Sequence, residues 1–191
     1  MRVLGIIGSP RKGGNTDVLV SEVLRGAAGR GAAVEKVYLN DLNMRGCQAC
    51  EACRAGGGYI GCVQDDDAPE VLEKLAAADS FVLGCPIYCF RPSAQAKTFL
   101  DRWYGLGYME NGERKSRLRG KQMVLVLVYG DDNPFTSGAM NAYGTFRDEA
   151  AWCGIDIVSV LYGSANKPGE IRENRQIMEE AYDAGRRLVV G

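Results

Sequence analysis

Apolar residues in this chain fall into short runs that alternate with longer segments of helical spacing. The runs of strand length occupy residues 3–7, 34–39, 80–85, 122–129 and 155–162. Apolar positions recur every three or four residues in 15–30, 68–78, 93–104, 139–152 and 172–189. This alternation predicts an α/β fold, with a doubly wound, five-stranded parallel sheet covered by helices on both faces. Ligands of such sheets bind beyond the carboxyl ends of the strands.

The turn after the first strand has the composition of a phosphate loop. Glycines allow the backbone to curl around an anion, and the following helix N-terminus favours negative charge. The candidate phosphate-binding residues combine hydroxyl, amide, basic and glycine positions: Ser9, Arg11, Lys12, Gly14, Asn15 and Thr16. The spacing fits neither GxxxxGK[ST] nor GxGxxG, which favours a monophosphate over a triphosphate or pyrophosphate. The alternative is an ordinary strand-to-helix turn.

The size and composition of the chain exclude several classes of function. The chain has 191 residues, which predicts one domain spanning 1–191, and its net charge of -1 gives no support for nonspecific nucleic-acid binding. It contains no histidine, which excludes metal sites built on histidine and acid-base catalysis by histidine. There is no signal-peptide pattern and no run of 18 apolar residues, so we expect a cytoplasmic protein without a membrane span.

Two segments interrupt the alternation of strands and helices. Residues 40–67 are too long for an ordinary connection and contain four of the seven cysteines, which predicts a functional cysteine-rich insertion. Residues 105–120 are polar and contain glycines, and they predict a surface loop or part of a subunit contact.

The four cysteines of the insertion are spaced C-x2-C-x2-C-x8-C, and they are Cys47, Cys50, Cys53 and Cys62. Two successive short gaps let three thiolates converge, while the fourth comes from farther along the insertion. Zinc is less favoured, because four-cysteine zinc sites commonly have two separated C-x2-C pairs. Spacing alone leaves an iron-sulfur cluster, zinc, redox-active thiols and packed thiols open.

Two motifs carry a family resemblance. GSPRKGGNT at 8–16 and GCPIYCFRPSAQAKTFLDR at 84–102 resemble the phosphate loop and flavin-ring loop of flavodoxin-like NAD(P)H-dependent FMN reductases, including iron-sulfur flavoproteins. This resemblance implies strand order 2-1-3-4-5 and FMN bound by its phosphate at the first loop. It also implies a [4Fe-4S] cluster on the four cysteines, although the last gap is longer than usual in that subgroup. A homodimer or homotetramer is expected by the same analogy.

The resemblance places the flavin ring between two further loops. The aromatic and proline-restricted segment after the third strand supplies Pro86, Ile87, Tyr88, Cys89 and Phe90, and the loop after the fourth supplies Tyr129 and Gly130. Aromatic side chains can stack on the ring, and backbone N-H groups can bond its polar edge. Lys97, Asp101 and Arg102 resemble the family's KxxxDR pattern, with a structural ion-pair cluster as the alternative.

These observations predict an FMN-dependent oxidoreductase in which the flavin, rather than a catalytic side chain, carries the chemistry. In the primary hypothesis the cluster relays electrons between FMN and a carrier such as ferredoxin, a partner implied by the resemblance. One alternative is a cluster-free reductase that uses NAD(P)H as co-substrate and reduces a quinone or flavin. The others are a non-catalytic flavodoxin-like carrier and a module that binds another phosphorylated ligand.

Overall fold

The computed structural model describes residues 1–55 and 58–189. Positions 56–57 of the predicted insertion and 190–191 of the predicted domain lie outside the described residues. The strands are β1 (Arg2–Ile7), β2 (Ala33–Tyr38), β3 (Ser80–Tyr88), β4 (Arg91–Pro92), β5 (Gly107–Glu110), β6 (Glu113–Ser116), β7 (Gln122–Tyr129) and β8 (Asp156–Ser164). The α-helices are α1 (Asn15–Ala28), α2 (Ala68–Ala77), α3 (Ala94–Arg102), α4 (Ala139–Cys153) and α5 (Arg175–Arg187). The 3-10 turns are η1 (Leu39–Asp41), η2 (Ala52–Arg54), η3 (Trp103–Leu106) and η4 (Glu170–Glu173).

The central sheet has the strand order β2-β1-β3-β7-β8, and these five strands are parallel. It confirms the predicted flavodoxin-like order 2-1-3-4-5. Five of the six residues of β1 and seven of the eight residues of β7 are buried, as expected for strands covered on both faces. The short strand β4 adds an antiparallel pair at the end of β3.

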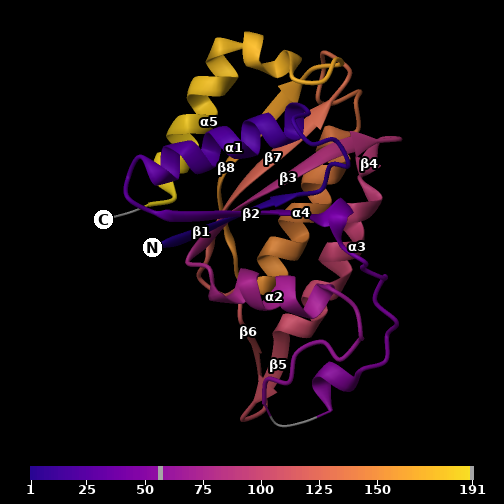
Figure 1. Cartoon of the computed structure of the whole chain (residues 1–191). Coiled ribbons are helices and arrows are strands. Elements are labelled where there is room, and N and C mark those ends of the chain that lie inside the picture. Colours follow the sequence, from indigo (N-terminus) through magenta and orange to yellow (C-terminus); the bar gives the residue numbers. More distant parts are fainter. Residues whose placement is uncertain (56–57, 190–191) are drawn as a thin grey trace.

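Helices cover the two faces of this sheet as separate layers (Figure 1). α1 and α5 pack together on one face, and α2, α3 and α4 lie on the other. The backbones of α1 and α5 approach very closely. A Cβ at Gly26 would lie 1.9 Å from the carbonyl oxygen of Tyr182, and one at Gly185 would lie 1.8 Å from that of Val23.

The predicted surface loop at 105–120 is a turn and an antiparallel hairpin, formed by η3, β5 and β6. Figure 1 shows this hairpin beside the cysteine-rich insertion, beyond the α2–α3 side of the molecule. Tyr59 of the insertion meets Tyr108 of β5 edge to face at 5.9 Å, and the Arg117 guanidinium lies over the Tyr59 ring. The hairpin therefore packs against the insertion and supports it.

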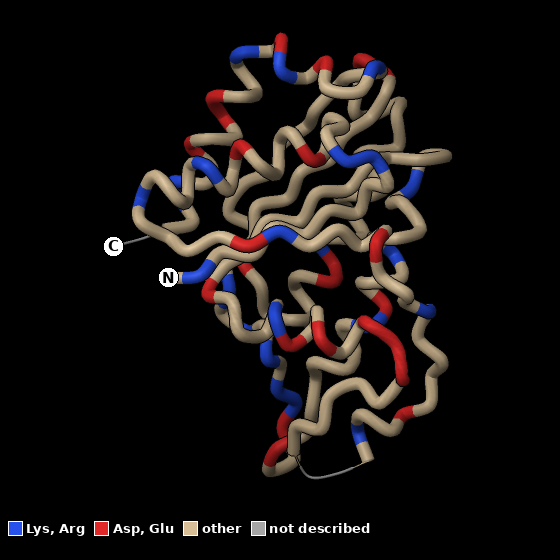
Figure 2. Tube along the Cα trace, viewed as in Figure 1, with Lys and Arg blue, Asp and Glu red and all other residues tan. Residues whose placement is uncertain are grey.

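Lys and Arg residues are interspersed with Asp and Glu along the trace in Figure 2. This distribution matches the near-zero net charge and leaves no broad face of a single sign in that view. Within the described part of the chain, every helix is too short or too polar to cross a lipid bilayer.

Candidate functional site

The phosphate loop runs from the end of β1 to the start of α1, and its fold leaves the helix N-terminus open. Gly14 occupies the N-cap position, where no side chain bonds the first-turn N-H groups of α1. Those groups also lack intrahelical acceptors, because a helix begins with four unpaired donors. A Cβ at Gly14 would lie 3.0 Å from the carbonyl oxygen of Arg11, and Gly13 has a φ of 72°. The glycines thus permit a tight turn that presents backbone donors to an anion.

Asp17, in the first turn of α1, stabilises this loop. Its carboxylate accepts hydrogen bonds from the Gly13 N-H at 2.7 Å, from Lys36 and from Tyr38 at 3.0 Å each. Burial opposes the charge of Asp17, but these hydrogen bonds outweigh it and hold the pKa of the carboxyl below its usual value. The loop is therefore fixed from the side of β2.

Ser93 connects the phosphate loop to the ring loop. Its hydroxyl accepts from the Ala96 N-H as the N-cap of α3 and donates to the Gly8 carbonyl at 2.7 Å. Gly8 in turn donates its N-H to the Gly84 carbonyl at 2.8 Å. The carboxyl ends of β1 and β3 are therefore joined where the sequence predicts the ligand.

A cavity of about 290 Å³ opens at these carboxyl ends. The phosphate loop, the ends of β3 and β7 and the loop after β8 line it, and the lining residues are Ser9, Arg11, Gly14, Asn15, Thr16, Pro86, Ile87, Tyr88, Val128, Tyr129, Gly130, Ala165, Asn166 and Pro168. Most of the predicted site residues are thus brought together. Lys12, Cys89 and Phe90 do not line the cavity.

Two residues of the phosphate loop have other partners. Lys12 pairs with Asp41 at 2.6 Å and lies over the Tyr38 ring, so its ammonium is not directed to the cavity lining. The side-chain amide of Asn15 donates to the Lys167 carbonyl at 2.9 Å and accepts from the Ile171 N-H at 3.3 Å. Asn15 therefore binds the loop after β8 with its side chain, while its own backbone remains at the helix N-terminus.

The ring loop is a tight hairpin, and its first residues, 86–88, belong to β3 rather than following the strand as the sequence predicted. β3 continues to Tyr88, which pairs with Arg91, and Cys89 and Phe90 form the two-residue turn with φ values of 47° and 66°. Such turns normally use Asn and Gly, because positive φ costs other residues about 1 kcal/mol or more each. Gly138 packs against this turn, where a Cβ would lie 2.3 Å from the Phe90 Cα.

This hairpin exposes aromatic surface at the cavity. Tyr88 lines the cavity and is 42% exposed, and Phe90 is 62% exposed at the tip. Tyr129 lies at the end of β7 and is buried, which raises the pKa of its hydroxyl. The cavity therefore has a basic and amide-rich end at the phosphate loop and an aromatic portion at Tyr88 and Tyr129.

The loop after β8 forms a wall that sequence reasoning missed. Asn166 lies over Gly130, since a Cβ on Gly130 would be 2.6 Å from the Asn166 side-chain oxygen. Glu170 accepts the N-H groups of Asn166 and Lys167 at 2.7 Å each, which fixes the loop. The available signal was its position directly after the last parallel strand, where ligand-binding loops gather.

The cysteine-rich insertion forms a second site, close to the carboxyl end of α3. All four predicted ligands, together with Asp101, Arg102, Tyr104 and Gly105, line one cavity of about 20 Å³. Cys47 and Cys50 are exposed, Cys53 is buried and Cys62 is partly buried. Across residues 1–55 and 58–189, no group of three or more Cys, Asp or Glu side chains is placed to hold a metal ion. The thiols therefore share a cavity without forming a preassembled single-ion site.

The other cysteines lie outside this group. Burial raises the pKa of Cys85 to about 11 and that of Cys153 to about 12, so both remain protonated packing residues at neutral pH. Cys89 is exposed in the hairpin turn.

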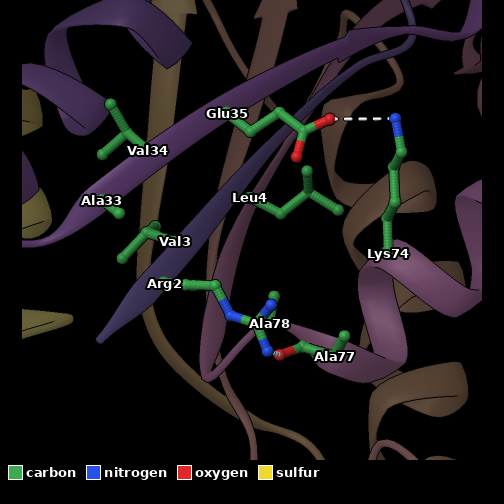
Figure 3. A pocket seen from close by; sticks show the side chains of 9 residues that line it. All are labelled: Arg2, Val3, Leu4, Ala33, Val34, Glu35, Lys74, Ala77 and Ala78. Carbon is green, nitrogen blue, oxygen red and sulfur yellow. Dashed lines mark hydrogen bonds and ion pairs between the residues drawn. The ribbon is translucent and has the colours of Figure 1, made fainter.

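A further cavity of about 240 Å³ lies at the amino-terminal end of the strands, opposite the first cavity (Figure 3). It lies beside the amino ends of β1 and β2, its walls are largely apolar, and Lys74 pairs with Glu35 across it at 3.0 Å. No helix N-terminus or glycine loop contributes to this cavity, so it lacks the anion-binding character of the first site.

Comparison with known proteins agrees with this geometry. A profile of the family described as NADPH-dependent FMN reductase matches residues 1–147. An iron-sulfur flavoprotein of Archaeoglobus fulgidus is 34% identical over 173 residues, which cover 90% of this chain and 72% of that protein. A Bacillus subtilis protein named as an NAD(P)H-dependent FMN-containing oxidoreductase is 29% identical over 182 residues, which cover 95% of this chain and 94% of that protein.

Two further relatives match over a shorter segment, and one solved structure shows the fold. The chain spans about half the length of two further iron-sulfur flavoproteins, from Methanosarcina thermophila and Methanocaldococcus jannaschii. The solved NAD(P)H:quinone oxidoreductase from Methanothermobacter marburgensis superposes with a TM-score of 0.75 over 99% of both chains, at 19% identity.

Proposed function

The chain belongs to the NADPH-dependent FMN reductase family, and we propose that it is an oxidoreductase in which a [4Fe-4S] cluster relays electrons between FMN and a carrier protein. Family membership confirms the resemblance predicted from residues 8–16 and 84–102. The partner we propose is a ferredoxin or a similar one-electron carrier, and the assembly a homodimer or homotetramer.

The first site fits FMN. The observation that carries this assignment is the open N-terminus of α1 at one end of a cavity that also contains Tyr88 and Tyr129. Backbone N-H groups and Arg11 suit a phosphate monoester, and the aromatic side chains suit a planar ring. FMN would supply the redox chemistry, because it exchanges one or two electrons. The protein residues bind the phosphate, orient the ring and shape access to it.

The second site supports the cluster assignment by its donor set. Four cysteines around one cavity match the thiolate ligation of [4Fe-4S] centres. A cavity of about 20 Å³ has room for roughly one water. Seating a cluster therefore requires movement of the outer wall, which contains the exposed Cys47 and Cys50.

The second candidate is a cluster-free reductase that takes electrons from NAD(P)H and passes them to a quinone or flavin. Its support is the similarity to the Bacillus subtilis protein along nearly the whole chain. The exposed side chain of Tyr88, which lines the cavity, also leaves room for a second planar molecule there.

The FMN assignment is tested by titrating the flavin-free chain with FMN and following the quenching of flavin fluorescence. Arg11→Ala should weaken binding about tenfold or more, because a hydrogen bond to a charged group contributes about 1.5–3 kcal/mol. Thr16→Ala should weaken it less. Arg30→Ala removes a positive charge beyond the other end of α1 and serves as the control. Unchanged affinity in both site variants would contradict the assignment.

The relay is tested by iron and acid-labile sulfide analysis of protein purified without oxygen. About four irons per chain would support the cluster. Cys50→Ser should lose iron and keep FMN, whereas Cys89→Ser, which changes an exposed cysteine outside the set, should keep its iron. Bound flavin without iron in the unmodified chain would select the cluster-free reductase.

A further inference from the structure

A buried ion pair lies directly behind the fourth cysteine of the insertion. The Arg102 guanidinium donates to both carboxylate oxygens of Asp66, at 2.6 and 3.0 Å, and both side chains are 0% exposed. The same guanidinium donates to the Cys62 sulfur at 3.1 Å. Arg102 is the last residue of the KxxxDR pattern, and no residue of that pattern lines the proposed FMN cavity.

This pair differs from the neighbouring ion pair of the motif. Lys97 and Asp101 pair on the exposed surface of α3, where such contacts contribute little to stability. Burying two charges has a large desolvation cost, and an apolar pair of similar volume is often at least as stable. In addition, Nε of Arg102 has no hydrogen-bond partner among the described residues. Fold stability alone is therefore a poor explanation for Arg102.

The guanidinium links both ends of the cysteine-rich insertion to α3. It donates to the Arg45 carbonyl at 2.7 Å, just before Cys47, while Asp66 accepts the Arg45 N-H at 3.0 Å. On the other side Gly105 lies against Cys62, where a Cβ would be 3.0 Å from the Cys62 Cβ. Cys62 is therefore held between a fixed guanidinium and the backbone of η3.

Two of the three other cysteines, Cys47 and Cys50, have much weaker support. Residues 43–51 have no helix or strand, Ala49 and Glu51 have positive φ values, and Cys47 and Cys50 are exposed. Only Cys53 of this group is buried, on the short turn η2. The ligand set thus has Cys62 held by the guanidinium and Cys53 buried on η2, whereas Cys47 and Cys50 are exposed in a segment without helix or strand.

We infer that Arg102 is a positioning residue that holds Cys62 in place before any metal binds, so that the C-x2-C-x2-C segment closes onto a preformed anchor. This inference rests on the proposed cluster function and names the residue that organises its site. A guanidinium next to a ligand sulfur also donates a hydrogen bond and places positive charge there, two of the features that set cluster potentials.

The test uses the full-length chain in metal-free and iron-loaded forms. Arg102→Met removes the donor, and the double variant Asp66→Asn with Arg102→Met avoids leaving a buried unpaired carboxylate. Lys97→Met is the matched control, because it removes a positive charge from the same helix at an exposed pair. FMN binding reports whether each variant is folded.

Hydrogen exchange of the metal-free proteins gives the first readout. In both Arg102 variants the amides of Arg45, Asp66 and Asp67, which are hydrogen-bonded at the two ends of the insertion, should exchange about tenfold faster or more, while the Lys97 variant and the phosphate loop stay unchanged. Iron content should fall by at least half, and the potential of any remaining cluster should become more negative. If Arg102→Lys restores both the iron content and the cluster potential, a positively charged donor at this position is sufficient to position Cys62.

The two hypotheses fail in different ways. If the unmodified chain binds no iron under reconstitution, the relay is wrong, but exchange in the metal-free proteins still decides whether Arg102 holds Cys62. If the unmodified chain binds iron and the folded Arg102 variants show unchanged exchange, iron content and potential, the positioning role is overturned while the relay stands.

Discussion

Replacing Gly185 by alanine should destabilise the layer formed by α1 and α5. The added Cβ would lie 1.8 Å from the Val23 carbonyl oxygen and 2.7 Å from its carbon. Carbon and oxygen atoms in such contacts stay about 3.3 Å apart, so the helices must separate locally by about 1.5 Å. Because both partners are backbone atoms, no side-chain rotation relieves the clash.

The expected loss in the free energy of unfolding follows from two opposing contributions. Forcing extra volume into a packed layer costs about 1–3 kcal/mol or more, and a clash with backbone belongs at the upper end. Alanine returns about 1 kcal/mol through its better helix propensity. The net loss is about 2 kcal/mol, or about 6 °C in Tm for a domain of this size.

Gly144→Ala is the matched control for this experiment. Gly144 lies within α4, and a Cβ there would meet no atom within 4 Å. The same substitution should therefore stabilise the chain by up to about 1 kcal/mol. Urea unfolding of both flavin-free variants, followed by circular dichroism, measures the difference. Equal or higher stability of the Gly185 variant relative to the Gly144 variant would refute the backbone-contact argument.

Two further predictions concern the phosphate loop. Lys12→Ala should reduce FMN affinity much less than Arg11→Ala, because Lys12 pairs with Asp41; equal losses in fluorescence titrations would contradict the geometry. Burial opposes the charge of Asp17, but its hydrogen bonds lower the pKa of this carboxyl in the folded protein. The ionised carboxylate therefore stabilises the fold at pH values above about 3.9, the pKa of Asp in the unfolded chain. This stabilisation is lost as the pH falls through the lower pKa of the folded protein. The stability gap between the unmodified chain and Asp17→Asn should therefore narrow between about pH 5 and about pH 2 in denaturant titrations, and a constant gap would count against this account.

Much of the fold follows from local sequence patterns. The order and approximate bounds of the five parallel strands and their helices agree with the pattern of apolar residues. Short apolar runs form buried strands, and apolar positions every three or four residues form helices that pack one face against the sheet. The phosphate loop at 8–16 is equally local, since glycines and a helix start are read from adjacent residues. The cysteine spacing indicated one site, and the four thiols do line one cavity.

Other features depended on tertiary contacts between distant residues. Lys12 pairs with Asp41 and Asn15 with the loop after β8, although both read locally as phosphate ligands. The positive φ values at Cys89 and Phe90 run against turn preferences and accompany close packing by Gly138.

The sequence by itself determined the α/β architecture, the glycine-rich turn before α1 and the grouping of four thiols, because each depends on residues close together in the chain. Tertiary structure alone decided which basic residue faces the cavity, which loop closes it and which buried arginine stands behind Cys62. The physical reason is that a polar side chain takes whichever partner the fold brings within hydrogen-bond distance, and that partner can lie 156 positions away, as for Asn15 and Ile171.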